Sequence, residues 1–262
     1  MFAEERQKKI VDIINAHGKI VVPELCELFG VSASTVRNDL RDLEEKNLIT
    51  RTHGGAITNS KAGHELLPTV KESKMMPQKR AIARAALELI NDGDIIAITS
   101  GTTTFELVRM LPQRKDLTVV TNDIMSAAWL EENADFNIVV LGGFLRNKYH
   151  TTFSPVRSEL LDTLNVDKAF LSCNGVSGKR GVTTPNLQSA LMVRDILKTA
   201  SEVYLLADSS KAGVVTFANI LNLHDLTAWI TDDNVEAEDM ETIQKETDVI
   251  VATNDRQEES AE

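Results

Sequence analysis

The 262-residue sequence has only two cysteines, few aromatic residues and no long hydrophobic run. Cys26 and Cys173 lie far apart, which excludes a disulfide framework or a four-cysteine zinc site, and we expect both to be small buried residues. No stretch approaches the roughly 18 apolar residues that span a bilayer, and residues 1–6 show no apolar signal core. We therefore expect a cytoplasmic chain with neither a membrane partner nor a metal site.

Positive charge is also scarce, with 28 Lys and Arg against 39 Asp and Glu and a net charge of −11. Phosphate binding normally requires a basic surface, so the whole-chain charge argues against a nucleic-acid partner. The acidity is uneven, however, because residues 1–57 carry 8 basic and 9 acidic side chains. Any DNA contact in this region therefore depends on where individual charges lie.

The first sixty residues contain three short helical patterns. Ile10, Ile13 and Ile14 form an apolar stripe in the first of them. Pro23 opens the second and Gly30 ends it, which are favourable positions for these two residue types. Ser32 is a natural N-cap for the third helix, which we expect to reach about residue 46. In the second helix the expected apolar face consists of Leu25, Leu28 and Phe29.

The third helical pattern has two distinct faces. Its apolar positions, Val36, Leu40 and Leu43, must point inward. The opposite side carries hydrogen-bonding side chains that suit base edges and phosphates. Two helices joined by a tight glycine turn, with a polar second helix, follow the helix-turn-helix plan. The candidate DNA-reading residues on this helix are Ser34, Thr35, Arg37, Asn38 and Arg41.

A small β-wing is expected after the third helix. Residues 48–51 have a strand pattern, and residues 52–57 supply a glycine-containing tip and a return strand. This places Arg51 and His53 where they could touch a DNA backbone or groove. The alternative interpretation is an ordinary solvated helix face on a small helical domain, with His53 a plain surface histidine.

Residues 77–252 alternate between apolar strands and helical patterns, which indicates a mainly parallel sheet covered on both faces. Before them, residues 58–76 are expected to form a linker, and after them residues 253–262 an acidic disordered tail. In such sheets ligands bind beyond the carboxyl ends of the strands. The expected fold is therefore α/β, with an N-terminal winged helix-turn-helix domain at residues 1–57.

One loop at a strand end is well formed for an anion. In the run Ser-Gly-Thr-Thr-Thr at residues 100–104, glycine admits the backbone, hydroxyls donate, and a helix N-terminus follows. Lys211, after another strand, offers a matching charge, and Arg146 is a further anion candidate. The run lacks the Gly-Lys-Ser/Thr ending of a nucleotide-binding loop, so no cofactor is implied. The simpler alternatives are that the hydroxyls only cap the helix and that Arg146 forms a surface salt bridge.

Two motifs in the N-terminal region resemble the DNA-binding domain of the DeoR/GlpR family of bacterial repressors. They are VSASTVRNDL at residues 31–40 and RTHGGA at residues 51–56. The C-terminal region resembles the sensor domain of the same family, which is similar to ribose-5-phosphate isomerase. The runs that carry this resemblance are SGTTT, TND, LGG, NGV and ADSSK, beginning at residues 100, 121, 141, 174 and 207.

The resemblance implies a repressor of sugar metabolism whose binding to double-stranded operator DNA responds to a phosphorylated sugar. It also implies a homo-oligomer, either a dimer or a tetramer. The family associates the first and last runs with phosphate and sugar recognition. The implied effector contacts are Ser100, Gly101, Thr102, Thr103 and Lys211, with Asn122 and Asp208 beside them.

The competing hypothesis is an active sugar-phosphate isomerase. Such an enzyme requires a base near a C2–H proton and an electrophilic partner. Asp208 is the best carboxylate and Lys211 the best electrophile, but a second, separately placed acid is not evident. We therefore predict a chain with no catalytic residues.

Overall fold

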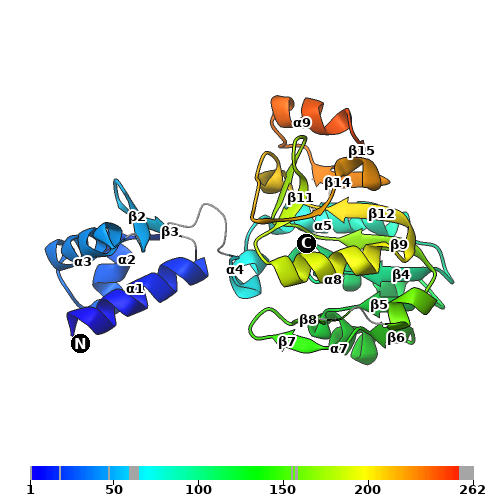
Figure 1. Ribbon diagram of the computed structural model, residues 1–262, viewed down its shortest axis with the longest axis horizontal. Coiled ribbons are helices and arrows are strands. Elements are labelled where there is room, and N and C mark those ends of the chain that lie inside the picture. Colours follow the sequence, from blue (N-terminus) through cyan, green and yellow to red (C-terminus); the bar gives the residue numbers. More distant parts are fainter. Residues whose placement is uncertain are drawn as a thin grey trace, which may run out of the picture. The chain divides into compact units, whose positions relative to one another are not determined.

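The computed structural model describes residues 2–17, 19–46, 48–58, 65–154, 156 and 159–253. The chain divides into two compact units, Met1–Lys71 and Glu72–Glu262 (Figure 1). The expected linker contains one short helix, α4 (Pro68–Glu72), and its residues 59–64 lie outside the described part. Residues 254–262 of the expected tail also lie outside it.

The N-terminal unit combines three helices with a three-stranded antiparallel sheet of order β1-β3-β2. Strands β2 and β3 form the expected wing, and β1 pairs with β3 from the other side. The elements are α1 (Ala3–His17), β1 (Lys19–Val21), α2 (Val22–Phe29), α3 (Ala33–Glu45), β2 (Ile49–Thr52) and β3 (Gly55–Thr58).

One apolar core holds this unit together. It joins the inner faces of the three helices through side chains such as Ile14, Leu25 and Leu40. Gly30 ends α2 in the left-handed region, at φ 63°, as expected of a glycine C-cap. Leu28 contradicts the predicted apolar face, because its side chain is 60% exposed. On a helix of only eight residues the core admits little more than one stripe, which Leu25 occupies with partly buried neighbours.

The C-terminal unit is built on a seven-stranded sheet of order β15-β14-β12-β9-β4-β5-β6, with parallel pairing throughout. All seven strands lie within residues 77–252, where the alternation of strands and helices was expected. The strands are β4 (Ile95–Ile98), β5 (Thr118–Thr121), β6 (Asn137–Val140), β9 (Val166–Leu171), β12 (Ala200–Leu206), β14 (Ala228–Asp232) and β15 (Asp248–Ala252).

Helices cover both faces of this sheet (Figure 1). On one face an apolar core packs beneath α5 (Met76–Leu87), α6 (Thr102–Val108) and α7 (Ile124–Asn133). The second core, on the other face, includes α8 (Leu187–Leu197) and reaches α9 (Ala237–Gln244) through Ile243. The strands run outward from the β9–β4 pair in both directions, so the strand order reverses at that pair.

Two antiparallel additions to the parallel sheet were not expected. They are the hairpin of β7 (Phe144–Arg146) and β8 (Thr151–Phe153), and a small sheet of β10 (Gly175–Ser177), β11 (Gly181–Thr184) and β13 (Ala218–Leu221). The expected loop at residues 100–104 is also shorter than predicted, because α6 begins at Thr102. Among the described residues, no helix has the length and apolar character required to cross a membrane.

Candidate functional sites

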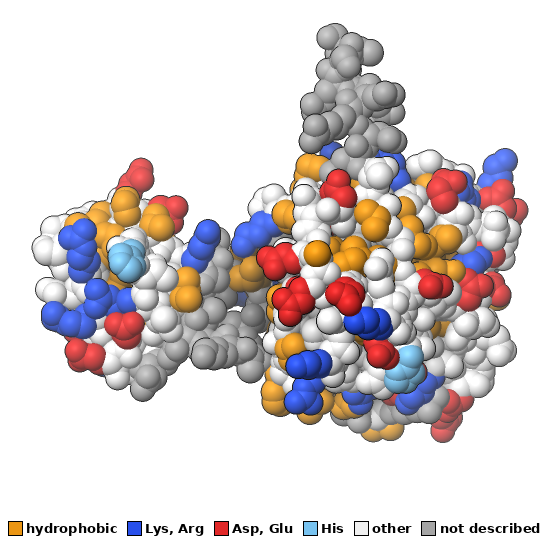
Figure 2. Space-filling model, turned by 90° about the horizontal axis from the view of Figure 1, so that it is seen from above, with side chains coloured by type: hydrophobic (Ala, Val, Ile, Leu, Met, Phe, Trp, Pro, Cys, Tyr) orange, Lys and Arg blue, Asp and Glu red, His pale blue; other side chains and the backbone are white. Residues whose placement is uncertain are grey.

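The first candidate site is the outer face of α3. Ser34, Arg37, Asn38 and Arg41 are all exposed on it, whereas Val36, Leu40 and Leu43 are buried. The helix begins as predicted, because the Ser32 hydroxyl accepts a hydrogen bond from the backbone N–H of Thr35 at 3.2 Å. Figure 2 shows Lys and Arg side chains and a histidine close together on the visible face of the N-terminal unit.

The predicted reading residues divide into two groups. The hydroxyls of Ser34 and Thr35 lie 2.7 and 2.9 Å from the Ser32 hydroxyl, so both belong to the cap. Among the described residues, the side chains of Arg37, Asn38 and Arg41 have no hydrogen-bond or ion-pair partner. These three side chains are therefore the ones that the fold leaves available to a ligand.

The wing places Arg51 and His53 in the open. Both side chains are exposed, and His53 lies at the turn between β2 and β3. The Arg51 guanidinium lies 3.7 Å from the Glu44 carboxylate, and the Arg51 backbone N–H donates to the same carboxylate at 2.9 Å. Glu44 therefore fixes the start of the wing against α3 and offsets part of the Arg51 charge.

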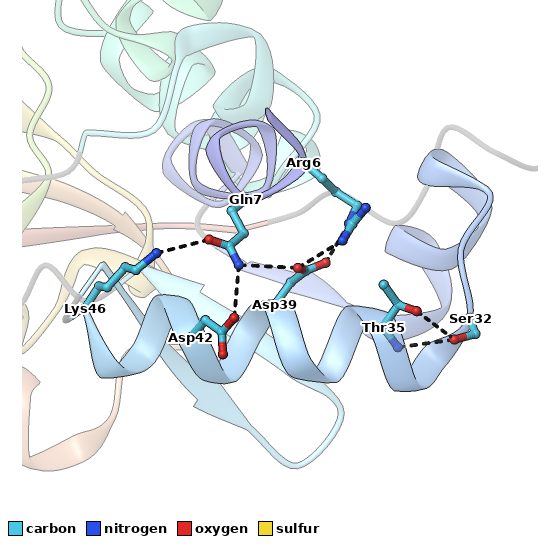
Figure 3. A network of polar contacts seen from close by, with 7 residues as sticks. All are labelled: Arg6, Gln7, Ser32, Thr35, Asp39, Asp42 and Lys46. Carbon is cyan, nitrogen blue, oxygen red and sulfur yellow. Dashed lines mark hydrogen bonds and ion pairs between the residues drawn. The ribbon is translucent and has the colours of Figure 1, made fainter. Parts of the chain in front are cut away.

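The inner face of α3 holds a polar network that the sequence analysis missed. Asp39 is almost fully buried and forms a two-point ion pair with Arg6 of α1 (Figure 3). Next to it, the Gln7 amide donates to Asp39 and Asp42, and Lys46 donates to Gln7. The sequence carried one signal of this network: α1 and α3 each have a charged residue at a position on the apolar face of the helix. Asp39 lies three residues after Val36, in the inward-facing register of α3.

The second candidate site lies at the carboxyl ends of the central strands of the larger unit. Ser100 and Gly101 follow β4, and α6 starts at Thr102. Gly101 lies so close to the end of β9 that a Cβ there would stand 2.4 Å from the Ser172 Cβ. Ser100, Gly101 and Thr102 are partly accessible, whereas Thr103 is buried. Of the predicted anion loop, the first three residues are therefore the ones open to a ligand.

Asn122 supports this loop through side-chain hydrogen bonds. Its side-chain oxygen accepts from the Ser100 backbone N–H at 3.3 Å, and its amide donates to the Thr151 hydroxyl and the Thr152 carbonyl. Asn122 is buried, and these bonds engage its oxygen and its nitrogen. Its place in the structure is therefore that of a support linking the Ser100 loop to β8.

Neighbouring strand ends carry two further buried carboxylates. Asp123 caps α7 by accepting from the backbone N–H of Met125 at 2.9 Å, and burial raises the pKa of its carboxyl group. Asp232 accepts from the Ser209 backbone N–H at 2.7 Å. Burial acts to raise the pKa of Asp232, but hydrogen bonds from Ser209 and Asn234 outweigh it and leave that pKa lowered.

Asp208 and Lys211 lie after β12, on the short turn at Ser209–Lys211. The Asp208 side chain is buried and caps this turn by accepting from the Ser210 backbone N–H at 3.1 Å and from the Ser210 hydroxyl. The Lys211 ammonium is partly exposed and donates to the Ser210 hydroxyl at 3.0 Å. Asp208 thus orients the turn, and Lys211 presents the charge.

The strand order in the sheet sets the spacing of the Ser100 loop and the Lys211 turn. One strand, β9, separates β4 from β12, so these two strands, which the Ser100 loop and the Lys211 turn follow, lie about 10 Å apart. Among the described residues, no hydrogen bond or ion pair joins the two groups directly. Arg146 lies on the β7–β8 hairpin, opposite Thr151, and its guanidinium stacks 3.7 Å from the centre of the Tyr149 ring.

Comparisons with known proteins match a separate family domain to each of the two units. Residues 6–62 match the DeoR-like helix-turn-helix domain, and residues 74–233 match the DeoR C-terminal sensor domain. The chain is 34% identical to the transcriptional regulator GlpR of Haloferax volcanii, covering 93% of this chain and 95% of that one. It is 36% identical to the lactose phosphotransferase system repressor of Streptococcus mutans, covering 88% and 93%.

Ribose 5-phosphate isomerase A from Methanocaldococcus jannaschii matches with a TM-score of 0.38 and 18% identity, covering 51% of this chain and 52% of that one.

Proposed function

Because this chain belongs to the DeoR family of helix-turn-helix transcriptional regulators, we propose that it represses a sugar-utilisation operon in the cytoplasm. In this proposal α3 and the wing bind operator DNA, and a phosphorylated sugar binds over β9 in the sensor domain. Sugar binding then releases the operator. Linkage requires the converse as well, so operator DNA weakens sugar binding by the same factor.

The observation that carries the DNA-binding part is the exposed, unengaged group Arg37, Asn38 and Arg41 on α3. Of the acidic residues on the same helix, Asp39 and Asp42 are turned inward and hydrogen-bonded, and Glu44 is engaged by Arg51 of the wing, whereas Glu45 is exposed near the helix end. This arrangement gives one cationic surface to a unit whose net charge is close to zero. We therefore assign the three unengaged side chains of α3 to the centre of the DNA contact. Its margin is assigned to Ser34, Thr35, Arg51 and His53.

The test of DNA binding begins with selection by the full chain from a pool of random-sequence duplexes at fixed salt. Arg37→Ala should then weaken binding to the selected duplex by about 1–3 kcal/mol if Arg37 reads a base. Lys179→Ala, which removes an exposed cation of the sensor domain, is the matched control and should bind normally. Failure of the wild-type chain to enrich any duplex would refute the proposal.

The effector part rests on Ser100, Gly101, Thr102 and Lys211, the accessible members of the two loops that flank β9. Backbone N–H groups at the start of α6 and the Lys211 ammonium suit a phosphate and its negative charge. Asn122 and Asp208 act behind them, as supports of the two loops. Thr103 is buried and contributes its backbone rather than its hydroxyl to the proposed contact.

A thermal-shift screen of the full chain against single pentose and hexose phosphates tests the effector site, because a specific ligand stabilises the native state by mass action. With the phosphate that stabilises the wild-type chain, Lys211→Ala and Thr102→Ala should lose both the shift and the release of operator. Both variants should still bind the selected duplex. A Lys211→Ala variant that responds at the wild-type concentration would contradict this assignment.

We propose that sugar binding occurs without catalytic turnover. The strongest candidate base, Asp208, is buried and accepts hydrogen bonds from both the backbone and the side chain of Ser210. A carboxylate engaged in this way serves as a turn cap rather than as a base beside an exposed C–H bond. Incubation with the same phosphates should leave them unisomerised, and detection of an aldose–ketose product would overturn this part of the proposal.

The proposed regulator acts as a homo-oligomer, either a dimer or a tetramer. Helix-turn-helix proteins read paired half-sites about one helical turn apart, which requires two copies of the reading helix. Sedimentation of the full chain with and without the selected duplex tests this. A monomer bound to a single half-site under all conditions would contradict it.

A further inference from the structure

The inner face of α3 is joined to α1 by a buried ion pair that has a strict geometry. The Arg6 Nε donates to one Asp39 oxygen at 2.6 Å, and the Arg6 Nη2 donates to the other at 3.1 Å. The two residues are only 8% and 4% exposed, and 33 positions separate them in the chain. A two-point pair of this kind has a narrow range of allowed orientations.

The connection continues along α3 (Figure 3). The Gln7 amide nitrogen lies 3.4 Å from Asp39 and 3.3 Å from Asp42, and the Lys46 ammonium donates to the Gln7 oxygen at 3.3 Å. Asp39, Asp42 and Lys46 follow each other at intervals of three and four residues, so they line one face of α3. Two adjacent residues of α1 therefore hold α3 at three points along two turns.

Apolar packing alone fixes the rotation of a helix about its axis less tightly than a two-point ion pair does. Val36, Leu40 and Leu43 are buried by a force that has no direction, and small rotations of α3 keep them buried. Side-chain tips stand about 5 Å from a helix axis, so a rotation of about 20° moves them by nearly 2 Å. A hydrogen bond to a base edge tolerates only a few tenths of an ångström.

These observations lead to one inference, which rests on the proposed DNA-reading role of the outer face of α3. We propose that Arg6 and Asp39 are positioning residues for sequence recognition: their ion pair fixes the rotation of α3, and with it the aim of Arg37, Asn38 and Arg41. A buried ion pair contributes little net stability compared with apolar residues of similar size, but it favours one orientation over its neighbours. The pair therefore acts on discrimination between sequences more than on affinity for DNA in general.

The test compares two affinities of the full chain at fixed salt: for the duplex selected by the wild-type chain, and for a scrambled duplex of equal composition. Asp39→Asn and Arg6→Ala should lower the ratio of these affinities at least tenfold and change binding to the scrambled duplex less than twofold. Arg6→Lys keeps the charge but loses the two-point geometry, and should give an intermediate loss. Because a smaller folded fraction lowers both affinities together, the ratio separates positioning from simple destabilisation.

Ile14→Val is the matched control. It loosens a fully buried contact of α1 in the same core without touching the ion pair, and it should leave the ratio unchanged. An Asp39→Asn variant that keeps the wild-type ratio within twofold would overturn this inference while the proposed function stands. An equal loss of ratio in Ile14→Val would also overturn it, because general loosening would then explain the effect. A wild-type chain that selects no duplex would refute the proposed function itself.

Discussion

Gly101 lies in the loop after β4 at a point that leaves no room for a side chain, and Gly101→Ala is the sharpest perturbation of this loop. The added Cβ would stand 2.4 Å from the Ser172 Cβ, 2.7 Å from the Ser172 hydroxyl and 3.0 Å from the Thr104 hydroxyl. Carbon atoms in contact normally lie about 3.5–4.0 Å apart. The alanine therefore fits only if the start of α6 and the end of β9 separate by more than about 1 Å.

The loss of stability depends on the contacts that resist this separation. Thr104 is buried and donates to the carbonyls of Thr99 and Gly101, and the Ser172 backbone N–H donates to the Thr99 hydroxyl. Overpacking of a site held in this way typically costs about 1–3 kcal/mol. We expect Gly101→Ala to lower the free energy of unfolding of the sensor domain by that amount and to abolish the response to sugar phosphate.

Urea unfolding followed by tryptophan fluorescence measures this effect selectively. Both tryptophans, Trp129 and Trp229, belong to the C-terminal unit, so the signal reports on that unit alone. Gly142→Ala is the matched control, because a Cβ added at Gly142 would meet no atom within 4 Å, and it should change the unfolding free energy by less than about 0.5 kcal/mol.

A double-mutant cycle identifies the contact responsible. Ser172→Gly removes the atoms that the new methyl group meets, so it should cost less in the Gly101→Ala background than in the wild-type chain. Equal stability of Gly101→Ala and the wild-type chain would refute the reasoning, as would strict additivity of the two substitutions.

Three further predictions concern supporting residues. Ser32→Ala removes the cap of α3 and should cost about 1 kcal/mol, seen as roughly fivefold faster hydrogen exchange in its first turn. Asn122→Ala removes three hydrogen bonds from a buried site and should cost about 3 kcal/mol by the same fluorescence assay; a loss below about 0.5 kcal/mol would contradict its supporting role. Because the pKa of Asp123 is raised in the folded chain, its contribution to stability is present at low pH and is lost as pH rises through that pKa. The unfolding free energy of the wild-type chain relative to Asp123→Asn should therefore fall as the pH rises above about 4, the ordinary pKa of an aspartate, and a rise would contradict the assignment.

Periodicity located most elements of this fold because their burial is one-sided or complete. The inward positions Val36, Leu40 and Leu43 of α3 and the apolar strand at Ile95–Ile98 gave strong local signals. The small antiparallel sheet gave none, since β11 is a four-residue strand buried at every position and shows no alternation. Leu28 was misplaced because a helix of two turns samples the helical period too briefly to define its apolar face.

The candidate sites were predictable only as far as residue type and strand position determine them. The loops at Ser100 and Lys211 follow from the rule that ligands bind at strand ends. Which residues are open to a ligand and which only support the loops depends on partners that are distant in sequence. Asn122 is a support because Thr151 and Thr152 lie beside it, and Asp39 is buried because Arg6 reaches it from another helix. Pairings of this kind leave no periodic trace in a single sequence.

The reversal of strand order at β9 and β4 has a consequence for the motions of the sensor domain. The chain segment that runs from β4 to β6 and the segment that runs from β9 to β15 meet in the sheet along a single pair of strands. A molecule held by both Ser100 and Lys211 would tie these two halves together across that pair. Its binding would restrict their relative fluctuation, so part of the regulatory signal would be carried by lost conformational entropy and be measurable as altered backbone order parameters.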